Sequence, residues 1–293
     1  MSAARQPSAL VLLLIYAGVW LIALVGINLL AMGAVGAWMA ATGDLQAYLD
    51  NPLKLLTLVD DGPVMSRLLA VTLLVQFPVM FGVAELCRYM GDRGILVEPG
   101  ASMREVYAWR STTPAVLAVG AALGLTAGWL PGWIAGTLRE LLPMLDLGAL
   151  GAIQAALTEG PLWTRVVVVL GVAVGAPVVE ELVFRGFMWW TIERALGPIA
   201  ALVGSSLLFG LYHMDPVQAF ALLFTAFVLG WVRRVTGSIF PCIALHAVNN
   251  SLGVVGAMLA QDDGKVPLPI VLGMAATTIG LAYLIWRVAP EEA

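Results

Sequence analysis

Long apolar runs alternate with short polar breaks along the chain. The breaks fall at turn-forming residues such as Gly197-Pro198, Asp215-Pro216 and Gly237. A helix needs about 20 apolar residues to cross the hydrocarbon core of a bilayer, and most of the runs reach or approach that length. The pattern therefore predicts an all-α, polytopic membrane helix bundle of about eight transmembrane helices in a single membrane domain, residues 1–293. The predicted spans are residues 9–41, 67–88, 114–136, 164–193, 198–214, 216–234, 238–260 and 268–288.

The N-terminal run is too long for the apolar core of a signal peptide and shows no clear cleavage site, so we expect it to be retained as the first span. Residues 137–162 mix apolar residues with Pro143 and Gly148, and we expect them to lie along the membrane surface or to dip into it. Residues 1–162 are thus predicted to hold the N-terminal spans and an interfacial segment. Residues 256–293 hold the last span and the C-terminal tail.

Composition supports a membrane protein and narrows the function. The chain is 60% hydrophobic and 12% charged, against about 25% charged residues in soluble domains. A net charge of −4 without any basic run offers no surface for nucleic acid, so we exclude nucleic-acid binding. Cys87 and Cys242 lie far apart in apolar stretches and are expected to be free thiols. Scarce lysine with abundant Gly, Ala and Val favours a bacterial source, and hence the bacterial plasma membrane.

Basic residues set the expected orientation, because cytoplasmic loops of membrane proteins are enriched in Lys and Arg. If the N-terminus is cytoplasmic, the inner segments carry more basic residues than the outer ones, so we expect both termini to be cytoplasmic. The inner set is Arg5, Arg88, Arg93, Arg104, Arg110, Arg194, Arg233, Arg234 and Arg287, and the outer set is Lys54, Arg67, Arg139, Arg165 and Lys265.

Three ionisable residues, Glu180, Glu181 and Arg185, interrupt the fourth predicted span. A charge at mid-bilayer costs roughly 2.5–3.5 kcal/mol, so such residues normally face a protein interior and mark function. Glu181 and Arg185 are four residues apart and can form an intrahelical ion pair. Glu180 lies about 100° further round the helix and is left to point elsewhere. Pro177 removes one backbone hydrogen bond and predicts a kink just before them.

The chain has two histidines, His213 and His246, and both lie in apolar spans after the glutamates. A carboxylate in a dry site is a better base, and a histidine beside it can share the proton of a water molecule, so the group can activate water. Asn250 lies four residues after His246, on the same helical face. Its amide and the His246 ring N–H are a suitable pair of donors for the oxyanion of peptide hydrolysis.

Three motifs together resemble a known family. Glu-Glu-x-x-x-Arg at 180–185, Phe-x-x-x-His at 209–213 and His-x-x-x-Asn at 246–250 are similar to the signatures of the type II CAAX prenyl endopeptidase and bacteriocin-processing (CPBP, or Abi) family of intramembrane proteases. The resemblance covers residues 164–255, which would form the catalytic module. It implies an endopeptidase that acts on a membrane-embedded or membrane-bound peptide or protein within the lipid bilayer.

The resemblance also implies roles for particular residues. Glu180 and His213 would activate water, and His246 and Asn250 would bind the oxyanion. Glu181 and Arg185, with Phe209 of the second motif, would support the site. The bacterial substrate is expected to be a peptide precursor or a membrane protein rather than a prenylated protein.

Metal dependence stays open. His213, His246 and Glu180 could form a three-ligand Zn²⁺ site with an open position for water. Glu181 would then have to act as the base while pairing with Arg185, and no His-Glu-x-x-His helix is present. We therefore favour a glutamate-type mechanism with no cofactor.

Two other classes of protein fit part of the pattern. A proton-coupled transporter could use the same carboxylate and histidines as a relay, although no inverted repeat is visible. A non-enzymatic membrane scaffold or immunity factor of the same family would retain the motifs without catalysis. Both remain alternatives to the protease.

Overall fold

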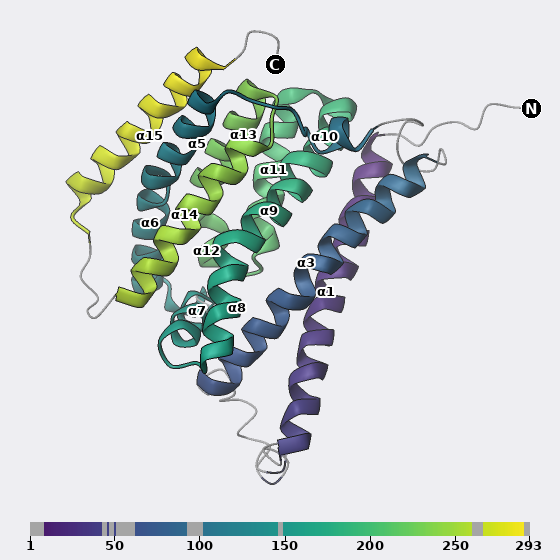
Figure 1. Cartoon of the computed structure of the whole chain (residues 1–293), viewed down its shortest axis with the longest axis vertical. Helices are drawn as coiled ribbons and strands as arrows, with labels where there is room; N and C mark the ends of the chain where they lie inside the picture. Colours follow the sequence, from purple (N-terminus) through teal and green to yellow (C-terminus); the bar gives the residue numbers. More distant parts are fainter. Residues whose placement is uncertain are drawn as a thin grey trace, which may run out of the picture.

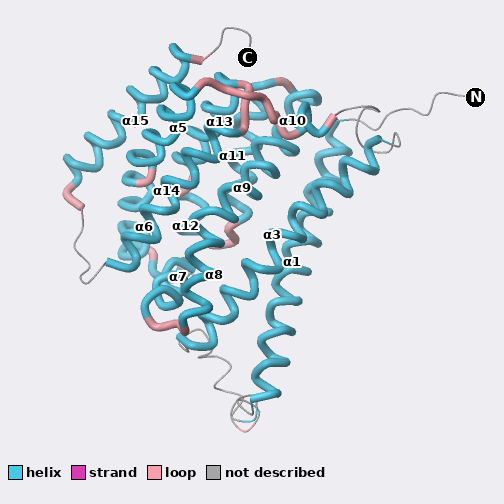
Figure 2. The backbone as a smooth tube through the Cα atoms, in the orientation of Figure 1, coloured by secondary structure: helices cyan, strands magenta, loops and turns pink. Residues whose placement is uncertain are grey.

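The protein is an all-helical bundle, seen in the computed structural model in Figure 1. The structure describes residues 9–42, 46, 50, 62–92, 102–145, 149–259 and 266–289. Over these ranges every regular element is helical and no strand occurs. Figure 2 shows the same helices as a continuous tube with short connecting loops. The predicted fold class, an all-α polytopic helix bundle, is confirmed.

Six helical segments in the described ranges are long and apolar enough to cross a membrane, two fewer than the eight spans predicted. The predicted span 198–214 is a helix of only 15 residues, which covers about 22 Å. The predicted span 216–234 is divided into two helices at Leu222. The six segments are Val25–Thr42, Val64–Leu86, Pro114–Leu141, Leu162–Leu196, Phe240–Leu259 and Leu268–Val288.

The N-terminal pair of long helices forms one side of the bundle. Helix α1 (Ala9–Thr42) and helix α3 (Gly62–Asp92) run antiparallel and pack along each other (Figure 1). The Tyr107 hydroxyl, just after the short helix α4 (Met103–Val106), donates a hydrogen bond of 2.6 Å to Glu85 of α3. This contact fastens α3 to the segment that leads into the rest of the bundle.

The opposite side of the bundle is built on a close helix pair. Helix α14 (Phe240–Leu259) packs against α5 (Pro114–Ala127), and a Cβ at Gly120 or Gly124 of α5 would collide with the α14 backbone. Small residues let two membrane helices approach this closely. The remaining helices on this side are α6 (Trp129–Leu141), α13 (Leu223–Thr236) and α15 (Leu268–Val288), with the 3₁₀ turn η2 (Pro143–Leu145) after α6. Helix α7 (Ala149–Thr158) packs against α3.

The central span is one long helical segment that changes its hydrogen-bonding pattern twice. A π-helical stretch precedes Pro177, where the absent proline N–H was expected to disturb the helix, and a second one follows Glu181. The successive parts are α8 (Leu162–Leu170), η3 (Gly171–Gly175), α9 (Ala176–Glu181), η4 (Leu182–Met188) and α10 (Trp189–Leu196), followed by α11 (Pro198–Tyr212) and α12 (Pro216–Ala221). π-helical turns inside helices are frequent at functional sites.

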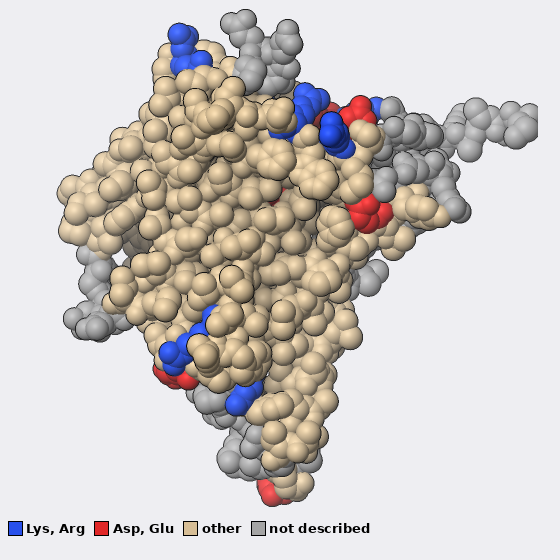
Figure 3. Space-filling model, in the orientation of Figure 1, with Lys and Arg blue, Asp and Glu red and all other residues tan. Residues whose placement is uncertain are grey.

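The described chain starts and ends at the same end of the bundle. The first turn of α1 and the last turn of α15 lie at the top of Figure 1, as do the last turns of α10 and α13. Those turns carry Arg194, Arg233, Arg234 and Arg287. Figure 3 shows the charged side chains of this face near the two ends of the molecule, with a broad uncharged band between them.

This arrangement agrees with placing both termini on one side of a membrane. Which side is cytoplasmic stays a prediction. Arg5, Lys54, Arg93 and Lys265, which entered that prediction, lie outside the described residues, as do the side chains of Arg88 and Cys87.

Candidate active site

The central helix buries three charged side chains. Glu181 and Arg185 are fully buried and Glu180 is 5% exposed. Arg185 Nη1 lies 3.3 Å from Glu181 Oε1, so the ion pair predicted from the four-residue spacing is present. Because buried ions cost free energy unless they are paired and hydrogen-bonded, the other contacts of the pair decide whether the cluster is stable.

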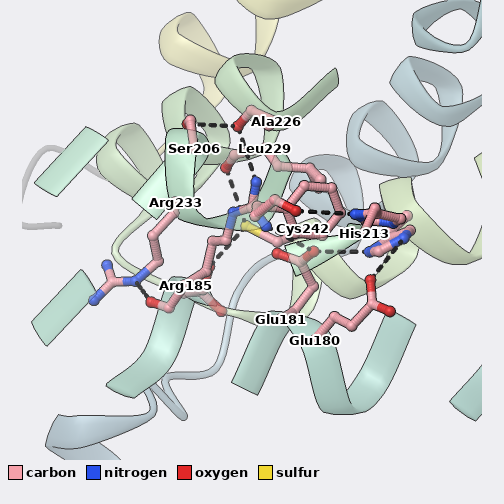
Figure 4. Close-up of polar contacts among 12 residues, drawn as sticks. Glu180, Glu181, Arg185, Ser206, His213, Ala226, Leu229, Arg233 and Cys242 are labelled. Carbon is pink, nitrogen blue, oxygen red and sulfur yellow. Dashed lines mark hydrogen bonds and ion pairs between the residues drawn. The ribbon is translucent and has the colours of Figure 1, made fainter. Parts of the chain in front are cut away.

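Arg185 joins the central helix to two neighbouring helices. Its Nη2 donates 3.0 Å to the Ala226 carbonyl of α13, which also accepts a hydrogen bond from Ser206 of α11 (Figure 4). The guanidinium lies 4.5 Å from the centre of the Phe209 ring, within the range of a cation–π contact. The Arg185 carbonyl in turn accepts 2.9 Å from Arg233 Nε. These contacts fix the position of the arginine.

His246 of α14 contacts both glutamates. Its Nδ1 lies 2.8 Å from Glu181 Oε1, and its Nε2 lies 3.8 Å from Glu180 Oε2. Since a carboxylate accepts, Nδ1 carries the proton of the shorter contact and Nε2 is directed to the Glu180 side. One oxygen of Glu181 thus serves Arg185 and His246 together. Sequence spacing predicted only the Arg185 contact, because no local signal links residues 65 positions apart.

His213 follows the last residue of α11 and is oriented by its own helix. Its Nδ1 lies 2.9 Å from the Phe209 carbonyl, which can only accept, so Nδ1 donates and Nε2 is left free. The Phe209 ring packs edge-on against both histidine rings, with centroids 5.1 Å from His213 and 5.7 Å from His246. The Phe209 ring therefore contacts both imidazole rings.

Asn250 connects α14 to the central span. Its Nδ2 donates 2.9 Å to the Val172 carbonyl in the first π-helical stretch, η3. The π-helical turn and the asparagine thus meet at the edge of the site. One amide hydrogen and the amide oxygen of Asn250 have no partner among the described residues.

One cavity of about 710 Å³ brings the predicted catalytic residues together. Glu180, His213, His246 and Asn250 all line it, while Glu181 and Arg185 lie behind them in the protein interior. Helices α1, α3 and α7 supply a further, mostly apolar part of the lining, with Ile27, Met65, Leu69 and Ile153. The cavity also contains uncharged polar side chains, namely those of Thr72, Gln76, Gln154, Gln218, Thr225 and Asn249. The four predicted catalytic residues therefore share one cavity that has both apolar and uncharged polar walls.

The predicted zinc ligands do not form a metal cluster. Among the residues that the structure describes, no three His, Cys, Asp or Glu side chains lie close enough to hold one ion. Nδ1 of each histidine is engaged, by Glu181 and by the Phe209 carbonyl, which leaves only Nε2 for a ligand role. Cys242 is buried, and its thiol contacts the Leu229 carbonyl. Nε2 of both histidines and the Glu180 carboxylate stay available as ligands, so the absence of a metal from the mechanism stays a prediction.

Asp215, two residues after His213, has a local structural role. It caps helix α12, where its Oδ1 accepts 3.0 Å from the Gln218 N–H. A cap or turn role is what Asp before Pro at a helix break predicts. Met214, between His213 and Asp215, has a left-handed backbone conformation with φ of 52°, whereas Asp215 is extended.

The comparisons with known proteins point to one family. The family model described as "Type II CAAX prenyl endopeptidase Rce1-like" matches residues 161–252. No curated protein and no solved structure matches the chain. The matched segment begins one residue before α8, ends inside α14 and contains every residue of the three motifs. Residues 161–252 are thus similar to the Rce1-like family of type II CAAX prenyl endopeptidases.

Proposed function

We propose that this protein is an intramembrane endopeptidase that hydrolyses a peptide bond of a membrane-associated protein or peptide precursor. The observation that carries the proposal is the convergence of Glu180, His213, His246 and Asn250 on one cavity walled by apolar helices. A peptide bond that enters such a cavity leaves bulk water and meets a carboxylate, two imidazoles and an amide, which are the groups that hydrolysis requires.

The first step is the activation of water by Glu180 and His213. Glu180 offers a carboxylate, and His213 offers the unprotonated Nε2 that its Phe209 contact leaves free. A water molecule between them transfers a proton to Glu180 as its oxygen attacks the carbonyl carbon. The proton then passes from Glu180 to the nitrogen of the leaving amine when the C–N bond breaks. Protons balance across the cycle.

The second step is the stabilisation of the oxyanion by His246 and Asn250. Nε2 of His246 donates only if the ring also keeps the Nδ1 proton that it shares with Glu181, so the donor is an imidazolium. With His246 charged, two carboxylates (Glu180, Glu181) are balanced by Arg185 and His246. The free amide hydrogen of Asn250 supplies the second donor. Loss of one such donor typically costs about 10²–10³ in kcat.

The supporting residues hold this charge pattern in place. Glu181 orients His246 through Oε1, and Arg185 holds Glu181 through the same oxygen. The engagement of Glu181 favours Glu180 as the base, since a carboxylate that binds an arginine and an imidazole is poorly placed to take a proton. We accordingly propose a metal-free reaction. The test is to measure the metal content of active protein and to follow its activity while a chelator removes metal. Activity that falls with the metal content and returns when Zn²⁺ is added would contradict the proposal.

The experiment that tests the function needs no known substrate. New peptide termini are mapped by mass spectrometry in membranes of the source organism that express the native chain, Glu180→Ala or the matched control Glu159→Ala at equal levels. Glu159 is an exposed glutamate directly after the last residue of α7. It does not line the active-site cavity. We expect termini that appear with the native chain and with Glu159→Ala but not with Glu180→Ala. Identical termini in all three strains, with folded protein in each, refute proteolysis.

A further inference from the structure

A second cavity of about 810 Å³ lies next to the active-site cavity along α14. It is formed by α5, α6 and α14, and its walls are mostly glycine, tryptophan and aliphatic residues. Two residues of α14, Asn249 and Gly253, line both cavities. The two cavities therefore adjoin at these positions, and a Cβ added at Gly253 would meet no atom within 4 Å.

Asn249 is a polar side chain with no hydrogen-bond partner among the described residues, although it lies in an apolar bundle and is only partly exposed. Its neighbour Asn250 is different, because the Asn250 amide is bound to the Val172 carbonyl. Because the Asn249 side chain is partly exposed and lines both cavities, its amide is available to a ligand that enters them.

The surroundings of Asn249 keep its side chain at the junction. Gly128, at the start of α6, lies against the Asn249 amide oxygen, and a Cβ there would collide with it. The lack of a side chain at Gly128 thus leaves room for the asparagine to lie between the cavities. A primary amide presents one donor edge and one acceptor edge, which matches the C=O and N–H of a peptide group.

The second cavity extends away from this amide as an apolar space. Gly132 and Gly136 of α6 and Gly256 of α14 line it, and a Cβ added to any of these glycines would meet no atom within 4 Å. The cavity is open where those side chains are missing. Trp129 and Trp133 provide broad apolar walls. The space suits bulky apolar side chains.

We propose that Asn249 is a substrate-binding residue whose amide pairs with a peptide group beside the scissile bond, while the adjoining apolar segment of the substrate occupies the second cavity. This inference rests on the proposed function and adds a specificity to it. The substrate is apolar on one side of the cleaved bond, and it extends past α14 rather than ending in the active-site cavity.

The test uses a synthetic peptide that spans the cleavage site found by terminus mapping, with the purified full chain in proteoliposomes. Asn249→Ala is expected to raise KM about tenfold, which corresponds to the loss of about 1.4 kcal/mol of binding, and to change kcat less than KM. A purely structural role would instead lower thermal stability and leave KM unchanged.

A second pair of variants tests the cavity itself. Gly256→Leu places a bulky side chain in the second cavity. The control is Gly280→Leu on α15. A Cβ at Gly280 also meets no atom within 4 Å, and Gly280 lines neither cavity. We expect Gly256→Leu to weaken binding of the full peptide and to spare a peptide shortened on its apolar side. Gly280→Leu should affect neither.

Binding to an inactive chain separates this inference from the proposed function. The same synthetic peptide is labelled with a fluorophore, and its Kd is measured for Glu180→Gln and for Glu180→Gln/Asn249→Ala. An about tenfold weaker Kd in the double variant supports the role of Asn249, whereas equal Kd values overturn it. Continued cleavage by Glu180→Gln would overturn the proposed mechanism and would leave the binding comparison valid.

Discussion

Replacing Arg185 should expose how much the protein depends on its buried ion cluster. In Arg185→Met a flexible apolar side chain fills most of the space, but Glu181 keeps a buried charge with His246 as its remaining partner. Removal of one member of a buried ion pair typically costs about 3–5 kcal/mol, because the other charge stays buried without compensation. We expect a loss of free energy of unfolding in that range.

The contacts around Arg185 allow this cost to be assigned. The Ala226 carbonyl keeps its hydrogen bond from Ser206 after the arginine is removed, so it is not left unsatisfied. The cation–π contact with Phe209 adds about 2 kcal/mol or less. The stranded Glu181 carboxylate is therefore the main source of the loss.

A double variant tests that assignment. In Glu181→Gln/Arg185→Met the amide oxygen can still accept from His246, and no unpaired charge remains. Unfolding is followed by circular dichroism during titration of mixed micelles with dodecyl sulfate. The double variant should be more stable than Arg185→Met by about 1–3 kcal/mol, the coupling usual for contacting residues. A single variant within 1 kcal/mol of the native chain, or a double variant less stable than the single, would refute the reasoning.

The remaining predictions concern packing, a helix contact and a turn. Gly124→Ala should destabilise the bundle by about 1–3 kcal/mol in the same titration, since its Cβ would overlap the α14 backbone, whereas Gly280→Ala should cost nothing; equal effects would contradict the packing argument. Trp231→Phe removes an indole N–H bonded 3.0 Å to a carbonyl of α15 and should cost about 1 kcal/mol; no change would show that the bond adds nothing. The backbone N–H of Ser102, and secondly its hydroxyl, hold the pKa of Glu105 below its ordinary value. The capping contact therefore stabilises α4 fully when the pH is above the ordinary pKa of a glutamate, and this stabilisation is lost as the pH falls through the lowered pKa. Carboxyl NMR titration should show the low pKa, and Ser102→Ala should raise it; an unchanged pKa in that variant would contradict the cause.

Local sequence signals predicted the elements and the short-range contacts of this protein well. The apolar runs located the helices, and the four-residue spacing of Glu181 and Arg185 predicted their ion pair. The kink expected from Pro177 stays a prediction, although a π-helical stretch does precede that residue. These features depend on residues within one or two turns of each other, where helix geometry alone sets the distance.

Contacts between distant segments were not accessible in the same way. The second partner of Glu181 is on another helix, and the binding of Asn250 to Val172 depends on how α14 packs against η3. The sequence predicted eight spans and the described residues contain six, because hydropathy does not show where an apolar helix ends. Asn249 carried no signal of its own, since only its place in the lining of two cavities distinguishes it from other polar residues.

Part of the wall of the active-site cavity is supplied by helices that precede the family-matched segment. Ile27 of α1, Met65 of α3 and Ile153 of α7 belong to this wall, whereas Glu180 and His246 belong to residues 161–252. In the proposed protease, the hydrolytic residues and this part of the wall around the substrate are thereby encoded in separate stretches of the chain. A lineage can acquire a new target by exchanging or remodelling its N-terminal helices while the hydrolytic residues stay untouched, and the same division offers a practical junction for chimeric enzymes.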